Sequence, residues 1–197
     1  MPNGHLSLQD LERMRIPKRY YMSSISQIEG ENRKLAERFV DLIKNNKNFN
    51  GGLLLFGLPG RGKHYLAVSI LKRLRAEVDC FRGLFVDAEE VDKNFLNAEY
   101  DEGETFEDRM KDVDLLVIGR FGFESYENFL RIFEIVRSRI DDMKNTIIVS
   151  VLTNKEDIEN KYPGFLPMIN GPIIPTLIKG KDYNEIEKEK IKSQLIS

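Results

Sequence analysis

The sequence predicts an α/β fold in which a parallel sheet is flanked by helices on both faces. The first observation is a glycine-rich loop at residues 57–64, which stands between an apolar run and a helical pattern. The second is a series of short apolar runs separated by helical patterns, an alternation typical of parallel sheets. The third is composition: 41% of the 197 residues are hydrophobic, enough to bury the core of one domain.

Residues 1–30 are predicted to form an N-terminal arm, and residues 31–197 the main domain. Four apolar residues of the arm have the spacing of a short amphipathic helix: Leu6, Leu8, Leu11 and Met14. Such a stripe either binds a partner or packs on the core. A basic patch with two tyrosines follows, formed by Arg13, Arg15, Lys18, Arg19, Tyr20 and Tyr21. This patch either contacts nucleic acid or lies at the edge of a nucleotide site.

The main domain is predicted to begin with a helix, because apolar residues recur at helical spacing between residues 32 and 44. An Asn-rich turn then leads into the first strand. Five strands are predicted, at residues 53–56, 83–87, 114–118, 146–151 and, as an edge strand interrupted by Pro175, 173–178. The charged residues 185–192 are predicted to form a terminal helix.

Charge and cysteine content exclude several classes of protein. The formal net charge of −2 gives no overall attraction to nucleic acid or to an anionic membrane. The sequence contains no apolar run of 18 residues, and its single cysteine, Cys80, excludes an internal disulfide framework. A cytoplasmic protein without membrane contact is therefore predicted. Cys80 precedes Phe81 at the entry to a strand, so we expect a buried structural thiol.

The phosphate loop, residues 57–64, follows the first strand and opens a helix, the context that this motif requires. Glycines at 57, 60 and 62 allow successive backbone N–H groups to turn toward phosphate oxygens. The N-terminus of the following helix adds a partial positive charge, and Lys63 reaches the β- and γ-phosphates. The loop therefore predicts a nucleotide site.

His64 replaces the Ser or Thr that usually ends this loop. That hydroxyl binds Mg²⁺, which bridges the β- and γ-phosphates. A neutral imidazole is bulkier and prefers softer metals, so His64 should weaken magnesium-dependent chemistry more than phosphate binding.

A second motif is expected at residues 114–122, where an apolar strand should end in two acidic residues, one for Mg²⁺ and one for the attacking water. The two positions are Gly119 and Arg120. Neither glycine nor a guanidinium can bind Mg²⁺ or accept a proton. Two interpretations of Arg120 remain open: it neutralises phosphate charge in place of the metal, or it is exposed or paired with Glu124.

With both motifs placed, the chain resembles the DnaC/DnaI/IstB branch of AAA+ ATPases, which comprises helicase loaders and their transposition relatives. The resemblance runs from about Ile16 to Tyr183 and includes the closing residues Gly180, Lys181, Asp182 and Tyr183. It implies a P-loop NTPase fold of the AAA+ type, with Tyr20 of the entry segment near the adenine. It also implies a replicative helicase or an active loader as the protein partner.

Three departures from the family pattern affect catalysis. Asn184 stands where the family's closing motif ends in an arginine, and no arginine finger is evident in residues 165–174. Val151 stands where the family has an asparagine that senses the γ-phosphate, although Asn154 could supply it after a short slip. With the altered metal positions, these departures predict little or no ATP hydrolysis, and no catalytic residue is assigned.

The segment from residue 87 to residue 114 bears on DNA binding. It holds twelve acidic residues against three basic ones, a local net charge of −9. Such a segment repels DNA, which does not favour DNA binding at this place. It is either a solvated acidic face or a surface for a basic protein partner.

Together the residues and the resemblance predict a helicase-loader-like protein that acts in DNA replication through protein contacts. It binds ATP or ADP weakly or not at all, with Mg²⁺ binding disfavoured, as a monomer or in a mixed complex. Two alternatives stay open: an active loader with metal ligands supplied by Asp87, Glu89 or Glu124, and an IstB-like transposition ATPase. The predicted nucleotide-binding residues are Gly57, Pro59, Gly60, Arg61, Gly62, Lys63, His64, Tyr20 and Arg120.

Overall fold

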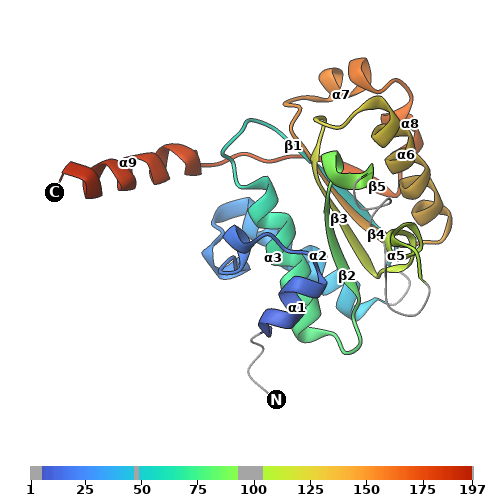
Figure 1. Ribbon diagram of the computed structural model, residues 1–197, viewed down its shortest axis with the longest axis horizontal. Helices are drawn as coiled ribbons and strands as arrows, with labels where there is room; N and C mark the ends of the chain where they lie inside the picture. Colours follow the sequence, from blue (N-terminus) through green and yellow to red (C-terminus); the bar gives the residue numbers. More distant parts are fainter. Residues whose placement is uncertain (1–5, 47–48, 93–103, 197) are drawn as a thin grey trace.

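The computed structural model describes residues 6–46, 49–92 and 104–196. Five strands form one parallel sheet in the order β2-β3-β4-β1-β5 (Figure 1). The strands are β1 (Gly52–Phe56), β2 (Gly83–Asp87), β3 (Leu115–Phe121), β4 (Asn145–Ser150) and β5 (Ile173–Leu177). The α-helices are α1 (Leu8–Arg13), α2 (Gly30–Asn45), α3 (Lys63–Glu77), α5 (Phe106–Asp112), α6 (Tyr126–Asp141), α7 (Lys155–Lys161), α8 (Phe165–Ile169) and α9 (Tyr183–Ile196).

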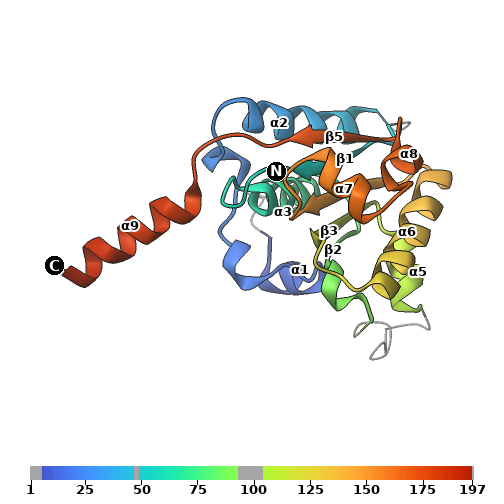
Figure 2. The ribbon, with the colours of Figure 1, turned by 90° about the horizontal axis from the view of Figure 1, so that it is seen from above.

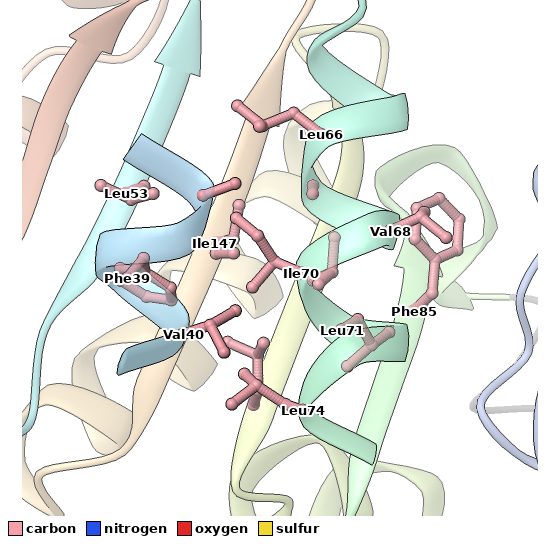
Figure 3. Packing of buried hydrophobic residues seen from close by; sticks show 14 of the residues in the cluster. Phe39, Val40, Leu53, Leu66, Val68, Ile70, Leu71, Leu74, Phe85 and Ile147 are labelled. Atoms are coloured by element: carbon pink, nitrogen blue, oxygen red, sulfur yellow. The ribbon is translucent and has the colours of Figure 1, made fainter. Parts of the chain in front are cut away.

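Helices cover both faces of the sheet, so the predicted α/β fold class is confirmed (Figure 2). Successive side chains of a strand point to opposite faces, and Leu53 and Leu54 of β1 accordingly belong to two different cores. The first core lies under α2 and α3, where Phe39 of α2 and Leu71 of α3 are buried with strand residues (Figure 3). The second lies under α5, α6, α7 and α8.

The arm packs on the first core. Leu11 and Met14, two members of its apolar stripe, are buried there, whereas Leu8 is 61% exposed. The backbone N–H of Phe85 in β2 donates to the carbonyl of Met14 at 2.8 Å, which covers part of the β2 edge. Of the two possibilities for the apolar stripe, packing on the core is therefore confirmed for Leu11 and Met14.

Cys80 is exposed, so the expectation of a buried thiol is wrong. Its φ of +59° belongs to a turn between α3 and β2, and this turn buries the neighbouring Phe81 instead. Since the side chains of adjacent residues in such a turn leave in different directions, only one of the two can enter the core.

Arg139 of α6 is a buried cation that the sequence did not reveal, with no exposed surface. Its guanidinium donates five hydrogen bonds, to the carbonyls of Met110, Lys111, Val113 and Asn145 and to the Thr146 hydroxyl. Burial lowers the pKa of Arg139 to about 9, which leaves it protonated at neutral pH. The side chain thus ties the end of α5 to α6 and the start of β4.

The C-terminal helix α9 extends away from the rest of the chain (Figures 1 and 2), with Ile186 and Leu195 exposed. Its ion pairs join residues of the helix to one another, as between Lys188 and Glu185. Among the described residues, no helix has the length and hydrophobicity needed to cross a membrane.

Candidate nucleotide-binding site

The phosphate loop connects β1 to α3 at the carboxyl end of the sheet. Gly57, Gly60 and Gly62 adopt φ angles of +126°, +76° and +78°, which residues with a side chain rarely adopt. Gly62 also caps α3, so the helix N-terminus begins directly at the loop. This is the backbone arrangement that presents N–H groups to an anion.

Lys63 is buried, with 7% of its surface exposed. Its ammonium donates to the carbonyls of Gly57 at 2.5 Å and Leu58 at 2.9 Å, within its own loop. Burial lowers the pKa of Lys63 because the charged form loses solvation. A phosphate at the loop would offer this ammonium a charged acceptor in exchange for two neutral ones.

His64 joins the phosphate loop to the end of β3. Its Nε2 accepts a hydrogen bond from the backbone N–H of Arg120 at 3.1 Å. Burial, as the largest cause, lowers the pKa of His64 to about 4, so the ring is neutral at pH 7 and its proton is on Nδ1. Nε2, the unprotonated nitrogen that could bind a metal, is therefore already occupied by the N–H of Arg120.

Arg120 lies at an irregular point of β3, where the pairing with β4 shifts and its own φ is +53°. Its guanidinium forms ion pairs at 2.8 Å with Asp87, which ends β2, and with Glu89 just beyond. The interpretation that paired Arg120 with Glu124 is wrong: Glu124 is buried elsewhere and accepts the N–H of Gly122 at 2.6 Å. Arg120 is thus paired with the carboxylates at and just beyond the end of β2.

Gly119 has no room for a side chain. A Cβ at this position would lie 2.5 Å from Oδ1 of Asp87 and 2.7 Å from Cζ of Phe85. The usual acidic residue is missing from the sequence, and adding one would require the side chains of Asp87 and Phe85 to move.

These contacts decide how well Mg²⁺, the usual ion of such sites, fits. His64 has committed its Nε2, position 119 has no carboxylate, and Asp87 and Glu89 already hold a guanidinium. No group of three His, Cys, Asp or Glu side chains among the described residues could hold a metal ion. The described residues around the loop therefore do not fit Mg²⁺.

Solved structures of similar fold include DnaI, with a TM-score of 0.69 and 21% identity over 85% of this chain and 94% of that one. The DnaC helicase loader gives a TM-score of 0.67 and 23% identity over 83% of this chain and 100% of that one. AMPPCP-bound DnaA from Aquifex aeolicus gives 0.60 and 21%, over 87% of this chain and 55% of that one. The chain has the AAA+ fold. No family model and no curated protein matches it.

In this domain, residues 180–183 contact the phosphate loop through hydrogen bonds that the sequence did not reveal. Arg61 donates to the carbonyl of Gly180 at 2.6 Å, and the N–H of Tyr183 donates to the carbonyl of Gly60 at 2.9 Å. A Cβ on Gly60 would meet the carboxylate of Asp182, so this position needs glycine for space as well as for φ. Arg61 is thus engaged by the closing segment, while Pro59 is exposed at the rim of the loop.

The entry segment brings Tyr20 to the same place. The ring of Tyr20 is parallel to that of His64, with centroids 6.3 Å apart, and the guanidinium of Arg19 lies 4.7 Å from the centre of the Tyr20 ring. Lys72 of α3 fixes this segment by donating to the carbonyls of Tyr21 and Ser23. Tyr20 therefore lies beside the last residue of the loop.

Two other sequence expectations can be placed. Asn154, the alternative γ-phosphate sensor, caps α7 by accepting the N–H of Asp157 at 2.8 Å.

In the acidic segment, residues 87–114, several carboxylates are paired with basic residues from outside it: Arg82 with Glu104 and Asp112, Arg120 with Asp87 and Glu89, and Arg131 with Asp92. Residues 93–103 of that segment lie outside the described residues. Part of the negative charge of the described residues in this segment is therefore offset by arginines outside it.

The buried imidazole of His64 predicts that acid destabilises the protein. The pKa of His64 is about 4 in the folded chain, against an ordinary value of 6.5. Between these values the unfolded chain binds a proton that the folded chain does not, so stability falls as the pH falls. From about pH 7.5 to about pH 5, this residue alone should lower the free energy of unfolding by about 2 kcal/mol.

Urea unfolding of the wild type and of His64→Asn at both pH values measures this contribution, because other groups titrate alike in the two proteins. The stability difference between the two proteins should shift by that amount as the pH falls. An equal decline in both would show that His64 is not responsible.

Proposed function

We propose that this chain is a helicase-loader-like AAA+ protein that acts in DNA replication by binding a replicative helicase or an active loader. Nucleotide at the phosphate loop modulates this binding, and ATP is hydrolysed slowly or not at all. The fold supports the role, since the chain is similar to DnaI and to the DnaC helicase loader over most of their lengths. One observation carries the loss of hydrolysis: Arg120 and His64 occupy the places that magnesium chemistry needs.

Lys63→Ala is expected to weaken ADP binding about thirtyfold, because a charge-assisted hydrogen bond to phosphate contributes about 2 kcal/mol. Calorimetric titration measures the affinity. Lys34→Ala, which removes an exposed lysine of α2, is the matched control and should bind like the wild type. Equal binding by Lys63→Ala and wild type would contradict a site at the loop.

The partner is tested by size-exclusion chromatography of the chain with the replicative helicase of its own organism, with and without ADP. Co-elution that changes with ADP supports the proposal, and separate elution in every condition contradicts it. Steady-state ATP turnover with Mg²⁺, helicase and DNA, lost in Lys63→Ala, would instead favour the active loader. Cooperative filaments on duplex DNA would favour the IstB-like ATPase.

A further inference from the structure

We infer that this site selects a nucleoside diphosphate, bound without magnesium, over a nucleoside triphosphate. The inference rests on the proposed function, because it concerns the same phosphate loop. It goes further in naming the ligand class and the residues that set it, which are His64, Asp87, Glu89 and Arg120.

The first reason is space. In P-loop proteins the loop holds the α- and β-phosphates, whereas the γ-phosphate and its metal lie toward the end of the second-motif strand. Here those two places touch, since Nε2 of His64 accepts the backbone N–H of Arg120 at 3.1 Å. The ring of Tyr20 lies parallel to the imidazole, with centroids 6.3 Å apart. The room for a third phosphate is therefore reduced, while the loop itself remains formed.

The second reason is charge. Three carboxylates lie within 4 Å of the Arg120 guanidinium: Asp87 and Glu89 at 2.8 Å and Glu90 at 3.9 Å. Carboxylates outnumber the guanidinium three to one here, while the positive charges of Arg19 and Lys63 act on the neighbouring His64. Oδ1 of Asp87 is buried without a hydrogen-bond partner, so it offers nothing but negative charge to an incoming phosphate. Without a metal, a phosphate placed against these three carboxylates is repelled by them.

Release of Arg120 toward a γ-phosphate does not remove this obstacle. The side chain of Asp87 is only 11% exposed, and loss of its guanidinium would leave a buried carboxylate unpaired. Such a charge is strongly unfavourable when its partner leaves. The diphosphate avoids this penalty, because the loop N–H groups and Lys63 bind it away from Asp87, Glu89 and Glu90.

Calorimetric titration of the full chain with ADP and with ATP, in EDTA and in excess Mg²⁺, tests the inference. In EDTA, ADP should bind about tenfold more tightly than ATP, an effect expected from one unfavourable charge contact. Mg²⁺ should change the affinity for ADP by less than about twofold and should not raise that for ATP above it. Equal or tighter binding of ATP in EDTA would overturn the inference and leave the nucleotide site standing. No binding of either nucleotide would overturn the proposed site itself.

Glu89→Gln identifies the cause of the preference. It removes one carboxylate charge but keeps the side-chain length, so the preference for ADP should narrow to about threefold through tighter ATP binding. Glu156→Gln, an equal change on the exposed surface of α7, is the control and should leave the preference unchanged. A preference that is the same in Glu89→Gln and wild type would overturn the assignment to these carboxylates.

Discussion

Replacing Arg139 by methionine is expected to lower the free energy of unfolding by about 3–5 kcal/mol, among the largest effects of any single substitution. The guanidinium donates to four backbone carbonyls and one hydroxyl, and it has no exposed surface. Methionine fills similar space but donates nothing, so several buried acceptors would lose their hydrogen-bond partners. Urea unfolding at neutral pH measures the loss.

Arg137 provides the matched control, because it is an exposed arginine on the same helix. Arg137→Met should change the free energy of unfolding by less than about 0.5 kcal/mol. If the two variants were equally stable, the hydrogen bonds of Arg139 would not be what joins α5, α6 and β4.

Gly119→Asp, which restores the acidic residue of the usual second motif, should lower the free energy of unfolding by about 3 kcal/mol. The new Cβ would lie 2.5 Å from Oδ1 of Asp87 and 2.7 Å from Cζ of Phe85, so these two side chains must move to admit it. The new carboxylate would also stand beside that of Asp87. Magnesium-dependent ATP turnover should not appear, because His64 and Arg120 still occupy their positions.

Two measurements separate the parts of this effect. Gly119→Ala adds the Cβ without the charge and should lower the free energy of unfolding by about 1–2 kcal/mol. The further loss in Gly119→Asp reports the repulsion between carboxylates, and it should shrink as the pH is lowered and the carboxylates become protonated. A Gly119→Asp protein as stable as the wild type, or one that hydrolyses ATP, would contradict the account of this position.

Much of the fold and part of the site were predictable from the sequence because the signals are local. The glycines of residues 57–64, placed between an apolar run and a helical pattern, specify a strand, a turn and a helix N-terminus from their own conformational preferences. The same holds for the apolar runs that form the sheet, although β3 extends to Phe121, beyond its predicted end. Cys80 shows the limit of this approach, because its exposure depends on which of two neighbours the turn directs inward.

By itself, the sequence determined the α/β fold class, the phosphate loop and the absence of the usual metal ligands, because each depends on the residue type at a given position. Only the tertiary structure decided what occupies those positions: Arg120 between Asp87 and Glu89, His64 against the end of β3, and residues 180–183 over the loop. The five acceptors that the Arg139 guanidinium binds were likewise decided only by the tertiary structure. The physical reason is that hydrogen bonds and ion pairs act over a few ångströms, and folding brings together residues tens of positions apart in the chain.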